Sequence, residues 1–296
     1  MQRNQPATGV AYAAAAYLTW GAFPLYFHAL GGVPAPQVLA HRILWSALFL
    51  VLLLTARRGW REAVRELRIP GTVPALAVSA TLIAANWLIY IWSVNAGHVL
   101  EASLGYFVNP LVMVVLGVAF QRDRLTRLQS AAVAVAAAGV LALVVWGHRV
   151  PWIALGLALT FGLYGLVRKR VRVGAATGLF CEVAVLSPLA ALYLAWLSRA
   201  GANAFGSSTR VTVLLAASGV VTAVPLMWFA LGVQRLRLST VGLLQYLNPT
   251  TQFLIAVFAF GEPFQRAHAV AFACIWASLA MYSADALARS RSGGTA

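Results

Sequence analysis

The stretch LGYFVNPLVMVVLGVAFQRD (residues 104–123) is apolar over most of its length, yet it contains an Asn-Pro pair, Asn109 and Pro110. A proline inside a helix lacks the N–H donor and leaves the carbonyl four residues earlier, here that of Tyr106, without its partner. The asparagine amide is also unfavourable in an apolar environment unless something hydrogen-bonds it. The pair therefore marks either a hinge or a polar site within an apolar segment.

The same pair occurs again 139 positions further along the chain. In LLQYLNPTTQFLIAVFAFGE (243–262), Asn248 and Pro249 stand where the first stretch has its own pair, and Pro249 releases the carbonyl of Gln245. Self-similarity at a fixed spacing is the signature of a duplicated structural unit. We therefore expect the chain to consist of two related halves.

The composition indicates that these halves lie in a lipid bilayer. The 296 residues are 61% hydrophobic and 10% charged, and the mean hydropathy is +0.80. Apolar runs of about 20 residues have the length of a membrane-spanning helix, and the first run lacks the cleavage site of a signal peptide. We expect ten transmembrane helices, at residues 8–28, 36–56, 73–95, 101–119, 127–146, 151–168, 176–197, 211–232, 239–259 and 266–287.

Ten spans divide into an N-terminal five-helix repeat, residues 1–147, and a C-terminal five-helix repeat, residues 148–296, within one membrane domain. Because five is odd, the second repeat must start from the opposite side of the membrane. Inverted repeats are typical of secondary transporters, which bind substrate near the membrane midplane between the halves. The expected fold is all-α, with two inverted five-helix repeats around a central cavity.

The basic residues predict the orientation of the chain. The formal net charge is +15, and most of the 22 Lys and Arg residues fall on alternate loops, which are the inner ones if the N-terminus is inside. This positive-inside pattern predicts a multi-pass protein of a bacterial-type cytoplasmic (inner) membrane with both termini inside. We expect the basic loops to contact anionic lipid. Nucleic acid is not an expected partner, because the arginines occur on separate loops; the oligomeric state stays open.

Polar and aromatic residues at mid-depth are candidates for a substrate cavity. At about 1.5 Å of rise per residue, both Asn-Pro pairs reach the middle of an apolar layer about 30 Å thick. The alternative is that the aromatic residues serve in packing or at the membrane interface. The candidates for the cavity wall are Trp20, Asn86, Tyr90, Tyr106, Asn109, Gln245, Asn248 and Gln252, and those for helix breaks or hinges are Pro24, Pro110 and Pro249.

Few charged residues fall inside the expected spans, and charge at that depth is a sign of function. Arg42 lies in the second span, Glu182 in the seventh and Glu101 at the start of the fourth. All three are candidates for charge recognition or coupling, and Glu182 is the best candidate for proton coupling. The structural alternatives are a snorkelling side chain for Arg42 and a helix-start carboxylate for Glu101. The basic run at 168–174 is interpreted as a topology anchor.

Catalytic and metal-binding patterns are absent from the sequence. Cys181 and Cys274 are isolated within apolar runs, and the histidines are scattered, so the spacing of a metal site is missing. No pairing of a nucleophile with a base occurs at matching depth. We therefore expect no cofactor, no metal and no enzymatic activity.

Five motifs together resemble one family. The chain is similar to the RarD-type branch of the EamA transporters, within the drug/metabolite transporter superfamily, which includes bacterial exporters of aromatic and other amino acids. The resemblance implies ten helices in two inverted repeats, a central cavity and alternating access. Where relatives often have Gly-Glu after the fourth span, this chain has Arg122 and Asp123. The motifs are AAYLTWGAFPLYF (15–27), LAHRILWS (39–46), NWLIYIWSVN (86–95), SLGYFVNPL (103–111) and RLRLSTVGLLQYLNP (235–249).

These features predict a transporter that exports amino acids, aromatic and neutral ones favoured, and related small metabolites. Arg42 or a half-helix N-terminus is available for a carboxylate, and the amide side chains are available for an ammonium group. An exporter of drugs or cationic metabolites, with Glu182 or Glu101 as the counter-charge, is the alternative within the same class. A channel is a further alternative, which would require a continuous polar stripe rather than polar groups clustered at mid-depth.

Overall fold

The computed structural model describes residues 5–121, 125–147, 150–171, 173–233, 235–236 and 244–292. All regular elements within these ranges are helices. In chain order they are α1 (Gln5–Gly21), α2 (Phe23–His28), α3 (Ala35–Ala56), α4 (Trp60–Leu67), α5 (Thr72–Asn95), α6 (Val99–Gln121), α7 (Arg127–Gly147), α8 (Trp152–Arg170), α9 (Ala175–Arg199), α10 (Thr209–Val233), α12 (Leu247–Leu254), the π-helix η1 (Ile255–Ala259) and α13 (Arg266–Ser292).

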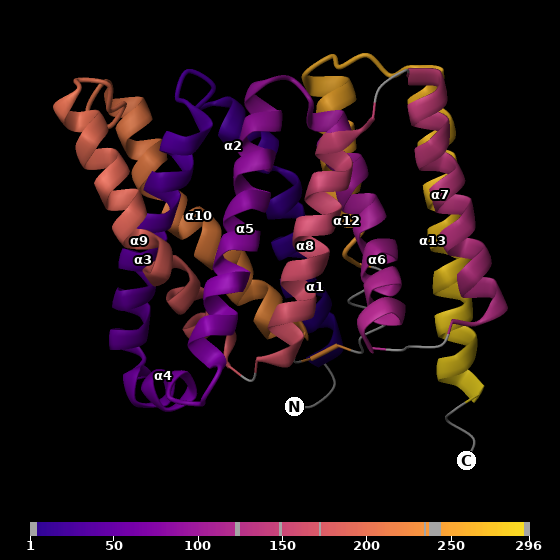
Figure 1. The fold of residues 1–296 in the computed structure, drawn as a ribbon, viewed down its shortest axis with the longest axis horizontal. Coiled ribbons are helices and arrows are strands. Elements are labelled where there is room, and N and C mark those ends of the chain that lie inside the picture. Colours follow the sequence, from indigo (N-terminus) through magenta and orange to yellow (C-terminus); the bar gives the residue numbers. More distant parts are fainter. Residues whose placement is uncertain are drawn as a thin grey trace.

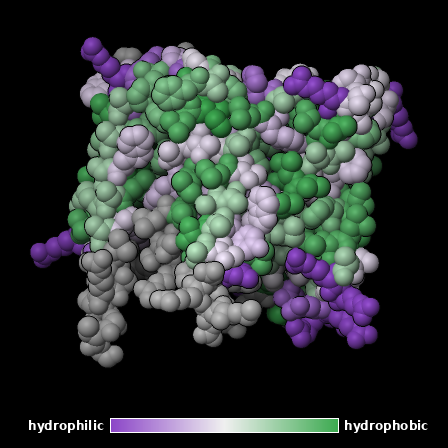
Figure 2. Space-filling model, turned by 180° about the vertical axis from the view of Figure 1, so that it is seen from behind, coloured by the Kyte–Doolittle hydropathy of each residue, from purple (hydrophilic) through white to green (hydrophobic). Residues whose placement is uncertain are grey.

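The surface of this helical bundle suits a membrane. Hydrophobic side chains cover the middle of the molecule, and hydrophilic ones gather mostly towards its two ends (Figure 2). Leu192 and Phe258 leave 70% and 78% of their surface exposed, which is unfavourable in water but not in lipid. Of the described helices, seven are long and apolar enough to span a membrane: α3, α5, α6, α7, α9, α10 and α13. The chain is thus a multi-pass membrane protein, as its composition predicts.

The first Asn-Pro pair does not break its helix. α6 runs through Pro110 without ending, so the expected helix break at this position is wrong. A proline inside a continuous helix removes one N–H donor, and the helix tolerates this where neighbouring helices support it. Pro110 therefore leaves a local gap in the hydrogen-bond ladder of α6.

The other two prolines stand at helix starts. Pro24 lies in the first turn of α2, just after α1 ends at Gly21, so the expected span 8–28 is divided into two helices. Pro249 lies in the first turn of α12, where a proline's missing N–H is harmless. The carbonyl of Gln245, which we expected to be free, accepts the backbone N–H of Asn248 at 3.3 Å. Residues 239–243 of the ninth expected span lie outside the described residues.

Helices from the first and second halves of the chain pack between one another (Figure 1). α8 packs against α5 and α6, while α1 packs against α10 and α12. α3 packs against α9 and α10, and α7 lies along α13 at the edge of the bundle. The start of α1, the end of α13 and the short helix α4 lie at the same end of the molecule (Figure 1). Each half of the chain therefore folds against the other and not as a separate body.

Glycine permits the closest of these helix contacts. A Cβ atom added to Gly105 on α6 would lie 2.8 Å from the carbonyl oxygen of Ala154 on α8. A Cβ atom on Gly219 of α10 would overlap the backbone of Trp45 on α3. Small residues are the usual means by which membrane helices approach closely, since lipid supplies no hydrophobic force between them.

Candidate functional site

Arg42 lies on α3 and is buried against α10, with 5% of its surface exposed. Its Nε donates a hydrogen bond to Oγ1 of Thr222 at 2.8 Å. The centre of its guanidinium group lies 4.0 Å from the ring centroid of Trp87, and 5.7 and 5.6 Å from those of Phe23 and Phe27. These are cation–π distances, and the burial excludes the snorkelling alternative for this arginine.

Three of the predicted cavity residues meet beside this arginine. The rings of Tyr90 and Tyr106 are 5.7 Å apart, and Oη of Tyr106 donates to Oδ1 of Asn86 at 3.4 Å. Nδ2 of Asn86 donates to the carbonyl oxygen of Leu157 and to Oγ1 of Thr160, both at 3.0 Å, and this ties α5 to α8. Oη of Tyr90 is buried and has no hydrogen-bond partner among the described residues.

The helices that carry the two Asn-Pro pairs each hold one buried, unpaired side-chain oxygen. Oδ1 of Asn109 is buried without a partner among the described residues, and so is Oε1 of Gln252. Nε2 of Gln252 donates to Oδ1 of Asn248 at 2.7 Å, one turn away on α12. Most buried polar atoms in proteins are hydrogen-bonded, so two unpaired carbonyl oxygens on neighbouring helices are candidate acceptors for a bound molecule.

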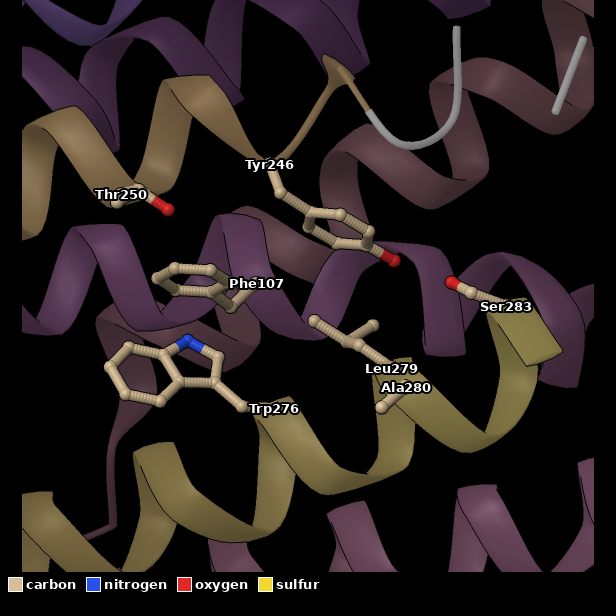
Figure 3. Close-up of a pocket in the computed structure, with 7 residues that line it drawn as sticks. All are labelled: Phe107, Tyr246, Thr250, Trp276, Leu279, Ala280 and Ser283. Atoms are coloured by element: carbon tan, nitrogen blue, oxygen red, sulfur yellow. The ribbon is translucent and has the colours of Figure 1, made fainter. Parts of the chain in front are cut away.

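Two residues that the sequence analysis missed connect the Asn-Pro helices. Phe107 on α6 stacks on Tyr246, with ring centroids 6.5 Å apart and planes 15° apart. Both line a cavity of about 290 Å³ (Figure 3) whose remaining wall comes from Thr250 and α13. The repeat itself offered the signal, because Phe107 and Tyr246 are equivalent positions under the 139-residue shift. The residues from α13 that line the cavity are Trp276, Leu279, Ala280 and Ser283.

Trp20 and Gln245 are held by other contacts. Trp20 packs against Tyr17 and Phe229, with ring centroids 5.6 Å from each. Gln245 is half-buried beside Tyr246 at the start of α12. The structure thus brings Arg42 together with Asn86, Tyr90 and Tyr106, and it brings Asn248 together with Gln252.

Glu182 lies in a second buried cluster, with 1% of its surface exposed. Its Oε1 accepts from Oγ of Ser79 at 2.7 Å and lies 3.6 Å from Nε of Arg168, while Oε2 accepts from Oη of Tyr164 at 3.5 Å. The carboxylate therefore faces α5 and α8 and not lipid. Arg168, which we interpreted as part of a topology anchor, reaches into the bundle as the partner of this glutamate.

Two glutamates accept backbone N–H groups at the starts of helices. Oε1 of Glu101 accepts the backbone N–H of Ile153 at the start of α8, at 3.0 Å, so this carboxylate serves a neighbouring helix and not its own. Glu262 accepts the N–H groups of Val99 and Leu100 at the start of α6, at 2.7 and 2.8 Å. Burial raises the pKa of the Glu262 carboxyl above its ordinary value, while these two N–H groups act in the opposite direction.

Apolar helices that enclose buried polar and charged groups are typical of membrane transporters. Residues 7–145 match the EamA-like transporter family. An uncharacterized transporter of Vibrio cholerae is 46% identical over 94% of this chain and 93% of its own length. Protein RarD of Escherichia coli is 45% identical over 97% of both chains. The chain therefore belongs to the EamA-like transporter family of the drug/metabolite transporter type, with RarD proteins among its relatives.

A solved crystal structure has the same fold at low sequence identity. It superimposes with a TM-score of 0.60 over 93% of this chain and 97% of the other, at 19% identity. At that identity the agreement concerns the fold alone.

Proposed function

We propose that this protein is a secondary transporter that exports amino acids, with aromatic and neutral ones favoured, and related small metabolites by alternating access. The proposal includes ten spans in two inverted repeats, residues 1–147 and 148–296. In this assignment, α1 with α2 forms the first span, α8 the sixth, and α12 with η1 the ninth. Both termini and α4 then lie on the cytoplasmic side of a bacterial inner membrane, next to anionic lipid.

The packing pattern supports the inverted repeat. In the proposed scheme α1 corresponds to α8, α5 to α10 and α6 to α12. α1 packs against α10 and α12, and its counterpart α8 packs against α5 and α6. α3 with α9 and α7 with α13 are pairs in which each helix packs against its own counterpart. A two-fold relation between the halves predicts this reciprocal pattern.

The observation that carries the function is the contact between Phe107 and Tyr246, the two equivalent aromatic residues. It indicates that the axis between the halves passes beside the Asn-Pro pairs, where transporters of this design bind substrate. The aromatic rings suit an apolar or aromatic side chain. The unpaired oxygens of Asn109 and Gln252 suit an ammonium group, since both are acceptors.

Counterflow in proteoliposomes tests the proposal. Vesicles preloaded with unlabelled amino acid should accumulate the labelled form, most strongly for phenylalanine, tyrosine, tryptophan and leucine. Asn109→Ala and Asn248→Ala should each lower the rate by about tenfold, because a buried polar contact is worth about 1–3 kcal/mol. Glu62→Gln, in the exposed pair with Arg65, is the control and should transport normally. Accumulation of none of the amino acids would refute the assignment of substrate.

Proton coupling is assigned to Glu182 in this proposal. The carboxylate has the hydroxyl of Ser79 and the guanidinium group of Arg168 as partners, so a change in its protonation would loosen the contact between α5, α8 and α9. An imposed pH gradient should therefore drive export. Facilitated export, which is the alternative, would be independent of that gradient.

A further inference from the structure

The guanidinium group of Arg42 is buried in the bundle, and no carboxylate of the described residues lies beside it. Ion pairs within 4.0 Å among the described residues join Arg65 to Glu62 and Arg168 to Glu182, and neither involves Arg42. Its contacts are the hydroxyl of Thr222 and three aromatic rings. A buried cation is strongly unfavourable unless a charge or several acceptors compensate it.

The acidic residues within the described part of the chain are engaged elsewhere. The chain has seven Asp and Glu residues, of which Asp123 lies outside the described residues. The six that remain each have another partner, so none of them is the missing counter-charge. These partners are Arg65 for Glu62, Gly174 for Glu66, Ile153 for Glu101, Arg168 and Ser79 for Glu182, Val99 and Leu100 for Glu262, and Gln129 for Asp285.

The hydroxyl of Tyr90 is an unsatisfied polar group beside Arg42. The hydroxyl of Tyr90 is buried without a hydrogen-bond partner among the described residues, and the residue is 3% exposed. The Tyr90 ring lies 5.9 Å from that of Phe27, on which the guanidinium group also packs. A cation without a carboxylate partner and a hydroxyl donor without an acceptor, both packed near the ring of Phe27, have the complementary chemistry of a carboxylate.

We infer that Arg42 and Tyr90 form a carboxylate-binding site, so that the transported molecule is an organic acid or a zwitterion and not a purely cationic compound. The guanidinium fork matches the two oxygens of a carboxylate, and Trp87, Phe23 and Phe27 provide an apolar wall for the group that the carboxylate carries. In the present structure the Nε–H group of Arg42 donates to the hydroxyl of Thr222, and a bound carboxylate would take the place of that hydroxyl as the acceptor. This inference rests on the proposed export function and narrows its substrate class.

The test uses two probes of equal shape, 3-phenylpropionate and 3-phenylpropionamide, which differ in charge at the carboxyl position. Binding to the purified full-length protein is measured by calorimetry, and each probe also competes with phenylalanine counterflow. The acid should bind at least about tenfold more tightly than the amide. Arg42→Gln should abolish that preference, Tyr90→Phe should reduce it, and Arg42→Lys should retain part of it.

Arg235→Gln is the matched control. Arg235 also packs on an aromatic ring, that of Tyr12 at 5.8 Å, but it is exposed and lies outside the site. The preference for the acid should be unchanged in this variant. If Arg42→Gln is not recovered as folded protein, the ratio of acid to amide binding in the wild type and in Arg42→Lys decides the question.

The outcomes separate this inference from the export function. Equal binding of acid and amide by the wild type, or an unchanged preference in Arg42→Gln, would overturn the carboxylate site, even where phenylalanine counterflow persists. An Arg42-dependent preference for the acid in a protein that shows no amino-acid counterflow would sustain the site and refute amino-acid export.

Discussion

Phe107 and Tyr246 stack on each other with ring centroids 6.5 Å apart although 139 residues separate them in the chain, and each stands two residues before the asparagine of an Asn-Pro pair. This contact joins α6 to the start of α12, and these two helices carry the side-chain oxygens of Asn109 and Gln252 that have no partner among the described residues. The two repeated stretches therefore meet through equivalent residues, as the proposed central site predicts.

The stack itself makes an energetic prediction. Phe107→Leu and Tyr246→Leu should each destabilise the protein and slow transport, and a double-mutant cycle should give a coupling of about 0.5–1.5 kcal/mol, the range for aromatic pairs. The measurement is thermal unfolding in detergent for the wild type, both single variants and the double variant. Strict additivity would mean that the rings make no specific contribution at this junction.

A close helix contact predicts a strong effect of one added methyl group. Gly219→Ala should lower the unfolding free energy by about 1–3 kcal/mol, because the new Cβ overlaps the backbone of Trp45 and the two helices must separate. Gly32→Ala is the matched control, since a Cβ atom there meets nothing within 4 Å. Comparable melting temperatures for the two variants would contradict the packing of α10 on α3.

The buried glutamate cluster predicts a loss of coupling without loss of binding. Glu182→Gln keeps a hydrogen-bonding partner for Ser79 but removes the charge that Arg168 pairs with. Counterflow, which needs no driving force, should persist in this variant, while acceleration of export by an imposed pH gradient should disappear. Glu66→Gln is the control and should retain the response to the gradient, since Glu66 lies near the end of α4 and accepts only the N–H of Gly174 before α9 among the described residues.

Glu262 predicts a pH dependence of stability. Its pKa is raised in the folded protein, chiefly by burial, so the folded state binds a proton more tightly than the unfolded state. The stabilisation from this carboxyl is therefore complete below its unfolded pKa and is lost as the pH rises through the higher folded value. As the pH rises from the unfolded pKa of this carboxyl to its folded pKa, the melting temperature should fall more steeply for the wild type than for Glu262→Gln. Parallel curves would show that Glu262 does not titrate in this interval.

The fold was predictable from the sequence to the extent that hydropathy and repetition determine it. Apolar length and the recurrent Asn-Pro pair predict a multi-pass helical membrane protein, and the position of Pro24 predicts the break between α1 and α2. The continuity of α6 through Pro110 was not predictable, because a proline in a helix is tolerated only where neighbouring helices support it. That support is a tertiary property.

The candidate site was predictable as a set of residue types but not as a set of contacts. Asn86, Tyr90 and Tyr106 are brought together beside Arg42, while their place in the wall of a substrate cavity stays a prediction. The partners of Glu101 and Glu182 come from other helices, and sequence spacing along one helix carries no information about them. Trp276 was missed for the same reason, since only the fold brings α13 to the Phe107–Tyr246 cavity.

The central claim is that the Asn-Pro pairs form one site that opens in turn to each side of the membrane. It is tested most directly by thiol labelling of Asn248→Cys, with Cys181 and Cys274 replaced by alanine. An impermeant maleimide should label this position from either side of oriented vesicles, and saturating phenylalanine should protect it from both. Labelling from one side alone, whatever the substrate concentration, would contradict alternating access at this site.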